Sequence, residues 1–264
     1  MILIKPAYRK VNFASIMTRT SLPQKINLAQ IKTACSTCSL HELCLPAELS
    51  QSELDMFDRV FDRRRPVKRG DYLYRAGSAL HSLYAIRAGF VKSSVMHEDG
   101  REQVAGFHMT GDLLGLDGIS TNQHTCDTVA LEDSELCEIP FASLEKLSRE
   151  IPSLQHHFHR MMSREIVRDH GVMLLLGSMR AEERLAAFLL SLSQRFAARG
   201  YSPTEFHLRM TREEVGSYLG LKLETISRVL SRFQEEGLIE VRNKHIKIIK
   251  LENLRELVSQ HGAS

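Results

Sequence analysis

The sequence lacks the features of a membrane-spanning or secreted protein. No uninterrupted apolar run approaches the roughly 18 residues that a membrane helix needs. The first twenty residues contain no long apolar core followed by small cleavage-site residues, so we expect no secretory signal. We therefore expect a cytoplasmic chain, in which thiols stay reduced. The five cysteines, an odd number, argue against a disulfide framework and leave metal ligation or inert burial.

The sequence also lacks a strong excess of charge and a catalytic pattern. Its net charge is only +3, with acids and bases interspersed, so bulk charge does not identify a nucleic-acid-binding protein. No Ser/His/Asp spacing, phosphate-binding glycine loop or separated carboxylate pair is present, and we therefore do not expect an enzyme. The 264 residues, 43% of them apolar, are enough for two domains with a sizeable core.

Residues from Arg69 to about Pro140 have the pattern of a β domain. Short apolar stretches such as SLYAIRA and FVKSSVM are separated by glycine-containing turn signals. The HEDG sequence at 97–100 is typical of a hairpin turn, because Asp-Gly accepts a positive φ. Several short strands at this spacing predict a barrel or a sandwich.

Residues 153–179 contain no proline and are rich in methionine and leucine, which predicts one long helix. Two seven-residue series run along it: His159, Ile166, Met173 and Met162, Asp169, Leu176. Together they approximate the seam of a coiled coil, which indicates a dimerisation helix. The predicted contact residues are Met162, Ile166, Asp169, Met173 and Leu176. If the seam is drawn one position off, Asp169 faces solvent instead.

Residues 208–250 predict a helix-turn-helix with a β wing. Thr211 and Glu214 form a capping box that opens the first helix. A break at Gly220 separates it from a second helix, and two short strands follow. A further helix is expected at about 180–199, ahead of this unit.

The second helix of this pair contains the candidate DNA-reading residues. Its apolar stripe must pack on the first helix. The opposite face, at the N-terminal end, presents Glu224, Thr225, Ser227, Arg228, Ser231 and Arg232. Arginine can donate two hydrogen bonds to guanine, glutamate can accept one from cytosine, and serine is adaptable. Their position fits a reading helix in the major groove, with basic wing residues near phosphates. The alternative interpretation is an ordinary solvated helix face.

The segment CSTCSLHELC, 35–44, is the densest group of candidate metal ligands. The chain's cysteines are Cys35, Cys38, Cys44, Cys126 and Cys137. Three neighbouring thiolates suit a soft metal or an iron–sulfur cluster, for which a downstream cysteine would supply the fourth ligand. With His41, the segment could instead bind zinc without a distal cysteine. Buried thiols without a ligand, or a redox-active pair, are further interpretations.

The combined motifs resemble the Crp–Fnr superfamily, and within it the oxygen-sensing fumarate and nitrate reduction regulators. The resemblance runs from about Cys35 to His261 and rests on segments such as CSTCSLHELCLP, EQVAGFHMTGDLLG, CEIPF and MTREEVGSYLGLKLETISRVLSRFQ. It implies an α+β chain with a cyclic-nucleotide-binding-like β-roll, a long dimerisation helix and a C-terminal winged helix-turn-helix. The implied parts are a flexible segment at 1–34, the cysteine segment and β-roll sensor at 35–152, the dimerisation helix at 153–179 and the DNA-binding domain at 180–264.

The resemblance also implies a cofactor. The family's distal cysteine lies in a VCEIP-like segment, here LCEIP, which assigns Cys137 as the fourth ligand. The implied ligands of a [4Fe–4S] cluster are Cys35, Cys38, Cys44 and Cys137. Cys126 matches no family ligand, and His41 loses its zinc role. A regulator of the same fold whose cysteines bind zinc or sense redox state is the alternative.

The resemblance further implies partners and a switch. Glu224, Ser227 and Arg228 would read double-stranded DNA at palindromic TTGAT-type half-sites, and the protein would be a homodimer while the cluster is intact. Oxygen would dismantle the cluster and restore the monomer, with charge repulsion between the two Asp169 side chains opposing dimerisation. RNA polymerase would contact the 97–101 turn and the Tyr201–Phe206 loop.

We expect no cyclic nucleotide as effector. The segment 111–133, where the cyclic-nucleotide-binding branch needs an arginine for the phosphate, contains no arginine or lysine. A buried phosphodiester would lack its cation, which is costly. A small-molecule-binding module or enzyme built on the β-roll is a third alternative.

Overall fold

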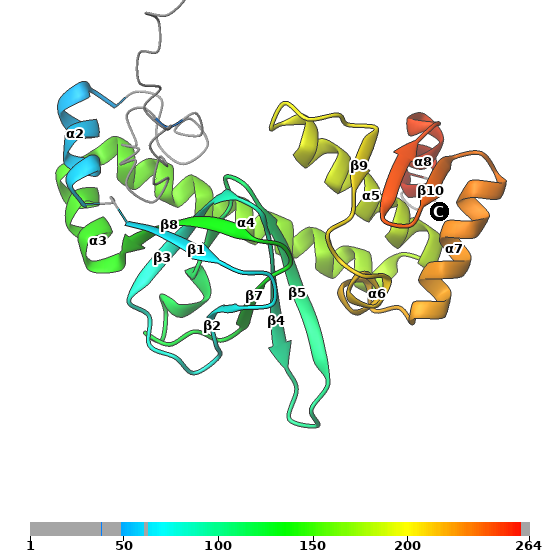
Figure 1. Ribbon diagram of the computed structural model, residues 1–264, viewed down its shortest axis with the longest axis horizontal. Coiled ribbons are helices and arrows are strands. Elements are labelled where there is room, and N and C mark those ends of the chain that lie inside the picture. The colour runs from blue at the N-terminus through cyan, green and yellow to red at the C-terminus, as the bar shows by residue number, and fades with distance from the viewer. Residues whose placement is uncertain (1–37, 39–48, 61–62, 260–264) are drawn as a thin grey trace, which may run out of the picture. The chain divides into compact units, whose positions relative to one another are not determined.

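The computed structural model describes residues 38, 49–60 and 63–259, all within one compact unit, 33–264. The first described helix is α2, Gln51–Val60, and an eight-stranded β-roll follows it (Figure 1). The strands are β1 (Arg63–Val67), β2 (Tyr72–Tyr74), β3 (Ser82–Ala88), β4 (Phe90–Met96), β5 (Glu102–Met109), β6 (Leu113–Leu114), β7 (Asp127–Ala130) and β8 (Ser134–Pro140). A short 3-10 helix, η4, spans Leu116–Gly118.

The β-roll consists of two four-stranded antiparallel sheets. Their strand orders are β1-β8-β3-β6 and β2-β7-β4-β5. Alternating side chains such as Ile86, Val91 and Leu136 are almost fully buried and form the core of the roll. The turn predicted at 97–100 joins β4 to β5, with Gly100 at φ 84°. The β domain predicted from the sequence is therefore confirmed.

Two helices follow the roll. α3 spans Phe141–Glu150 and packs on α4, which spans Pro152–Ser178. α4 is the long helix predicted at 153–179, and it begins with a proline at its first turn, where the missing N–H is not needed. Neither α2 nor α3 was predicted. None of the helices in the described part of the chain is long and apolar enough to span a membrane.

The C-terminal part is a winged helix-turn-helix. Its elements are α5 (Ala181–Ala197), β9 (Glu205–His207), α6 (Arg212–Leu219), α7 (Leu223–Glu235), β10 (Ile239–Arg242), β11 (His245–Ile248) and α8 (Leu251–Ser259). The predicted capping box is present, because Thr211 Oγ1 accepts from the Glu214 N–H at 3.1 Å and the Glu214 carboxylate accepts from the Thr211 N–H at 2.7 Å. Gly220 ends α6 in the left-handed conformation, with φ 63°.

Two features of this part differ from the expectation. The Tyr201–Phe206 segment, expected to be an exposed loop, runs into strand β9, and Phe206 is only 6% exposed. β9 pairs with β11 and makes the wing a three-stranded sheet, β10-β11-β9. Helix α8 was not predicted, and Leu254 anchors it in the core.

One hydrophobic cluster joins the edge of the β-roll to the helix-turn-helix. It contains Val104 and Phe107 of β5 together with apolar residues of α5, α6 and α7. The ring centroid of Phe107 lies 5.2 Å from that of Tyr218 on α6, and the Tyr218 ring lies 5.8 Å from that of Phe188 on α5. These contacts place α6 directly against β5.

Candidate functional site

Cys137 lies in the middle of strand β8 and is partly exposed. Its cross-strand neighbours are Arg64 on β1 and Ala85 on β3. Burial raises the pKa of the Cys137 thiol above its ordinary value, and the nearby Cys38 thiol raises it further. Cys38, from the predicted ligand segment, therefore lies near enough to Cys137 to influence its thiol electrostatically. Cys35, Cys44 and His41 lie outside the described residues.

Two arginines flank Cys137. Arg64 and Arg87 each place a guanidinium nitrogen 3.3 Å from a Glu135 carboxylate oxygen, and both lower the pKa of the Cys137 thiol. Within the described part of the chain, Arg64 Nη2 is buried without a hydrogen-bond partner. A buried guanidinium nitrogen is costly to leave unpaired, so the surroundings of Cys137 on this sheet suit an anionic group such as a thiolate. Among the described residues alone, no three His, Cys, Asp or Glu side chains are arranged to hold a metal ion.

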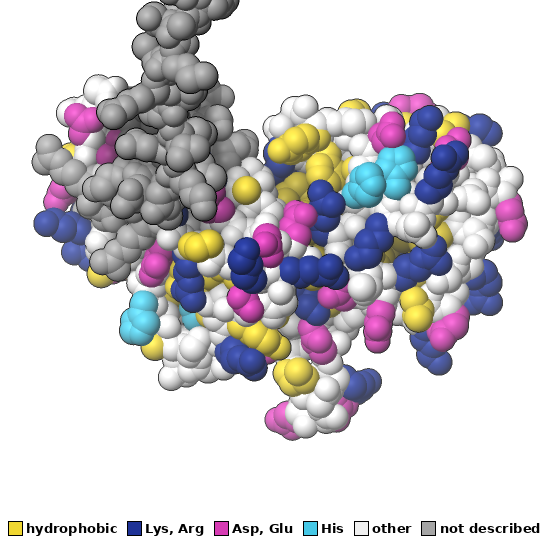
Figure 2. Space-filling model, in the orientation of Figure 1, with side chains coloured by type: hydrophobic (Ala, Val, Ile, Leu, Met, Phe, Trp, Pro, Cys, Tyr) yellow, Lys and Arg dark blue, Asp and Glu magenta, His cyan; other side chains and the backbone are white. Residues whose placement is uncertain are grey.

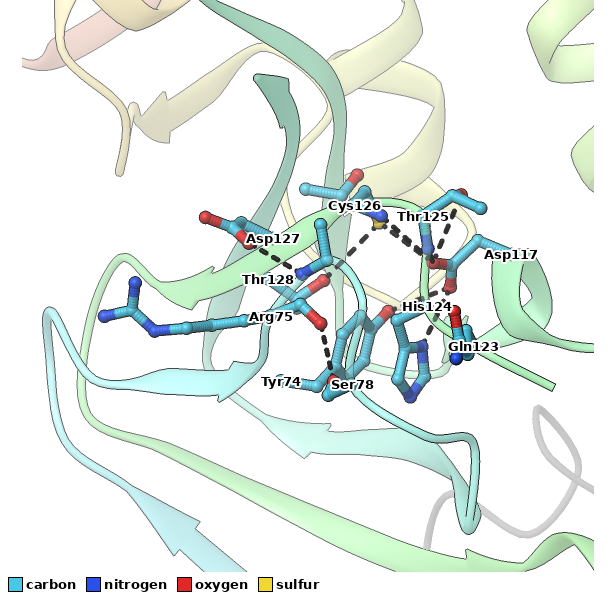
Figure 3. Close-up of polar contacts among 12 residues, drawn as sticks. Tyr74, Arg75, Ser78, Asp117, Gln123, His124, Thr125, Cys126, Asp127 and Thr128 are labelled. Carbon is cyan, nitrogen blue, oxygen red and sulfur yellow. Dashed lines mark hydrogen bonds and ion pairs between the residues drawn. The ribbon is translucent and has the colours of Figure 1, made fainter. Parts of the chain in front are cut away.

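Cys126 occupies a different environment, shown in Figure 3. Its buried thiol donates a hydrogen bond to Asp117 at 3.3 Å, and the same carboxylate accepts from the Thr125 N–H at 2.8 Å. Burial and the Asp117 charge raise the pKa of Cys126 to about 12. A thiol that stays protonated is a poor metal ligand. The two downstream cysteines thus differ in their neighbours: Cys126 bonds to the Asp117 carboxylate, whereas Cys137 lies beside Arg64 and Arg87.

The proposed seam residues on α4 divide into two groups. Ile166 and Met173 are 54% and 62% exposed, and Asp169 is also exposed. Met162 and Leu176 are partly buried in their own chain, and the Leu176 carbonyl accepts a hydrogen bond from Arg184 at 2.9 Å.

Two further apolar residues on α4 were not predicted from the sequence. Val167 is 65% exposed and Leu174 is 62% exposed, and each directly follows a residue of the predicted seam. Ile166, Val167, Met173 and Leu174 are called the α4 apolar face below. Their spacing of i, i+1, i+7 and i+8 places them on one side of the helix and was readable from the sequence.

Helix α7 has one buried face and one exposed face. Its buried residues, Ile226, Val229, Leu230 and Phe233, pack into the helix-turn-helix core. On the other face Glu224 and Arg228 are exposed, and Ser227 is half-buried. Arg212, at the start of α6, donates a hydrogen bond to Ser227 Oγ at 3.2 Å. Arg212 was not predicted as a site residue, although its place beside the Thr211 cap puts it at the same end of the motif.

Basic side chains surround this exposed helix face. Arg242 and Lys244 are exposed at the tip of the wing, where Asn243 has φ 58°. Figure 2 shows Lys and Arg side chains gathered over the wing and α7. Arg232, further along α7, is held by Glu236 at 2.8 Å and Glu182 at 3.2 Å. The local charge pattern therefore suits a polyanion near the N-terminal half of α7.

Comparisons with known proteins agree with this architecture. A Crp-like helix-turn-helix domain matches residues 183–257, and a cyclic nucleotide-binding domain matches residues 64–150. The fumarate nitrate reduction regulatory protein of Klebsiella oxytoca is 46% identical over 244 residues, which cover 90% of this chain and 98% of that protein. The chain belongs to the family of fumarate and nitrate reduction regulatory proteins. The family member from Escherichia coli K12 is also 46% identical, over 241 residues that cover 89% of this chain and 96% of that protein.

Solved structures give the same assignment of the fold. FixK2 from Bradyrhizobium japonicum superposes with a TM-score of 0.68 at 30% identity, over 74% of this chain and 96% of that chain. As a member of this family, the chain is a transcription regulator with a DNA-binding helix-turn-helix, and not an enzyme. The predicted superfamily, the α+β fold class and the winged helix-turn-helix are confirmed.

Proposed function

We propose that this transcription regulator responds to oxygen through a [4Fe–4S] cluster. The proposed ligands are Cys35, Cys38, Cys44 and Cys137. The proposal is carried by the electrostatic influence of Cys38 on Cys137, beside an Arg64 Nη2 that has no hydrogen-bond partner among the described residues. A cluster held by four thiolates is anionic, so it fits a site with two flanking arginines. When bound, the cluster supplies the oxygen-sensitive group.

The described residues suggest how ligation acts on the chain. Cys137 sits on β8, and α3 and α4 follow this strand directly. Ligation would tie the segment around Cys38 to β8 and thus fix the part of the β-roll from which α4 leaves. We infer that this attachment controls whether α4 can pair with a second copy.

Dimerisation is proposed through the α4 apolar face and the neighbouring seam residues. Four large apolar side chains exposed on one helix favour burial against another protein surface. Asp169 lies on the same helix and is exposed. In a symmetric dimer two Asp169 carboxylates would approach each other, and juxtaposing buried charges costs several kcal/mol unless it is compensated. This repulsion would keep the cluster-free protein mostly monomeric.

DNA recognition is proposed through Glu224, Ser227 and Arg228. Their side chains can form hydrogen bonds to base edges, while Arg212 and the wing residues Arg242 and Lys244 would contact phosphates. A homodimer would place two α7 helices about one DNA turn apart, ~34 Å, and so read palindromic TTGAT-type sites. Such a regulator would act in the cytoplasm, with its DNA.

The β-roll is proposed to bind no cyclic nucleotide. A cavity of about 420 Å³ lies between the roll and α4, lined by Asp117, Glu165 and Asp169 and by a single arginine, Arg168. Arg168 already pairs with Glu165 at 3.0 Å and lies 3.8 Å from Asp112. An anionic phosphodiester would meet more negative than positive charge there.

RNA polymerase is the proposed third partner. The 97–101 turn is exposed at the tip of the β4–β5 hairpin, next to Met96, which is 56% exposed. Tyr201 is 59% exposed ahead of β9. Exposed aromatic and methionine side chains are common at protein interfaces, which supports both surfaces as contacts.

The alternative is a regulator of the same fold whose cysteines bind zinc or sense redox state. The deciding experiment compares Cys137→Ser with Cys126→Ser after anaerobic purification. The proposal expects Cys126→Ser to keep its iron and brown colour and Cys137→Ser to lose both. Equal iron in the two variants, or zinc in place of iron in the unaltered protein, would refute the cluster.

A further inference from the structure

Helix α6 packs over β5, the edge strand of one sheet of the β-roll. β5 is the last strand of the sheet β2-β7-β4-β5, so its outer N–H and C=O groups have no neighbouring strand. Ser217 of α6 bonds to two of them: its Oγ accepts from the Val104 N–H at 2.9 Å and donates to the Glu102 carbonyl at 3.2 Å. The Gln103 side chain also donates to the Ser217 carbonyl. One serine thus docks the first helix of the DNA-binding motif on the roll.

A half-buried lysine makes a second connection between the same elements. Lys92 of β4 is only 13% exposed, and its Nζ lies 3.0 Å from a Glu102 oxygen and 3.1 Å from Glu214 Oε1. The other oxygen of Glu214 accepts the Thr211 N–H that completes the cap of α6. Burial lowers the pKa of Lys92, but the two glutamates outweigh this effect and hold it above its usual value. The same carboxylate therefore caps α6 and pairs with the β-roll.

The contacts of Ser217 and Lys92 are the directional part of an otherwise apolar interface between α6 and the β-roll. The tilted ring contacts of Phe107, Tyr218 and Phe188 favour burial but permit some rotation, since the hydrophobic effect is non-directional. The hydrogen bonds of Ser217 and the ion pairs of Lys92 do have preferred directions. They fix how α6 turns on the sheet, and α7 follows α6 because the two share one core.

We propose that Lys92 and Ser217 are positioning residues for DNA binding, which orient α6 and α7 on the β-roll so that a homodimer presents two reading helices at one fixed spacing. This inference rests on the proposed binding of palindromic DNA. Neither residue bonds to Glu224, Ser227 or Arg228 in the described part of the chain. We expect them to act on the relative geometry of the two α7 helices in the dimer. If this geometry must first be ordered on binding, the affinity for a palindrome falls.

The test measures the affinity of anaerobically prepared dimers for DNA of varied half-site spacing. The duplexes contain a single TTGAT half-site, a palindrome with matched spacing, or palindromes with one or two inserted base pairs. The variants are Lys92→Met and Ser217→Ala, with Lys92→Arg as the conservative replacement. Lys68→Met is the matched control, since it removes the same charge from an exposed ion pair of the β-roll. Iron content, dimer fraction and unfolding temperature are measured on each variant.

We expect a loss of DNA affinity that depends on the spacing between the two half-sites. Lys92→Met should bind the matched palindrome about tenfold more weakly than the unaltered protein, a coupling within the usual range for buried contacts. When base pairs are inserted between the half-sites, Lys92→Met should lose much less affinity than the unaltered protein does. Both proteins should bind the single half-site with the same affinity. Lys92→Arg and Lys68→Met should behave like the unaltered protein. If Lys92→Met does not fold, Ser217→Ala carries the same expectation, because it removes only a hydroxyl group.

A second background tests whether Lys92 acts through Glu214. Glu214→Gln keeps the capping box, in which glutamine also serves, but removes the charge that Lys92 meets. In this background Lys92→Met should have little further effect on spacing dependence. Unchanged affinity and spacing dependence in Lys92→Met and Ser217→Ala, or tighter binding, would overturn the inference. An unaltered protein that binds no palindrome would instead remove the proposed function, and the inference with it.

Discussion

Asp112, between β5 and β6, accepts a hydrogen bond from Arg199, just beyond α5, at 2.7 Å. Arg195 of α5 bonds to the same carboxylate, and Arg168 of α4 lies 3.8 Å away. Asp112 is 8% exposed, so one buried carboxylate connects the β-roll to both helices. Burial raises the pKa of Asp112, but the three arginines outweigh this effect and hold it below its ordinary value.

The first prediction follows from this contact. Asp112→Asn should lower the free energy of unfolding by about 3 kcal/mol, because it leaves partly buried guanidinium groups without their counter-charge. Urea denaturation measures the change. Asp133→Asn is the matched control, since Asp133 is an exposed carboxylate that pairs with Lys68 and accepts the Arg69 N–H, and it should have little effect. Similar losses in the two variants would show that the Asp112 network does not stabilise the fold.

The second prediction concerns pH. His108 is buried, and burial lowers its pKa from 6.5 to about 4, with the charges of Arg168 and Arg195 acting in the same direction and Asp112 opposing them. Between these two values the unfolded chain binds a proton that the folded chain does not. Stability should therefore fall as the pH drops from about 6.5 towards 4, by on the order of 3 kcal/mol in total.

The measurement is the free energy of unfolding between about pH 7 and pH 5. His108→Gln should show a flatter dependence than the unaltered protein, because the group that takes up the proton is gone. His170→Gln, at an exposed position of α4, should keep the original slope. An unchanged slope in His108→Gln would assign the acid sensitivity to other groups.

Much of this architecture was predictable because local signals agreed with the tertiary structure. The capping box at Thr211 and Glu214, the glycine at Gly220 and the apolar stripe of α7 each specify a local feature that packing then preserves. The glycine-rich turns specified the β-roll in the same way. Sequence periodicity also located the long α4 helix within one residue of its observed ends.

The parts that were missed depend on contacts between distant segments. α3 has a short pattern with Leu144 and Leu147 as its buried residues and no side-chain cap, so its helical state depends on packing against α4. β9 is three residues long and exists as a strand only because β11 pairs with it. The ion pair of Lys92 with Glu214 joins two domains, and no local sequence pattern predicts it.

The third prediction concerns the α4 helix. Asp169→Ala should raise the dimer fraction and DNA binding in air, because it removes the proposed repulsion between protomers. Glu145→Ala, at an exposed acidic position on α3, is the control and should remain monomeric in air. Analytical ultracentrifugation and DNA-binding titrations measure both properties. If Asp169→Ala stays monomeric and does not bind DNA in air, repulsion between the Asp169 side chains is not what opposes dimerisation.

The fourth prediction separates base reading from phosphate contact. Arg228→Ala should cost about 1–3 kcal/mol of binding free energy at the preferred half-site and much less at a site with a changed guanine. Lys244→Ala should weaken binding to all sequences similarly and reduce the salt dependence by about one phosphate contact. Binding titrations at several salt concentrations distinguish the two. Equal behaviour of the two variants would contradict the assignment of α7 as the reading helix.

The central claim is that an intact iron–sulfur cluster determines whether two chains pair. The most direct measurement is the iron and sulfide content per chain of anaerobically purified protein, together with its oligomeric state before and after exposure to air. The account predicts about four iron and four sulfide per chain with a dimer before exposure, and loss of both with a monomer afterwards. A preparation without iron, or a dimer that is unaffected by air, would contradict it.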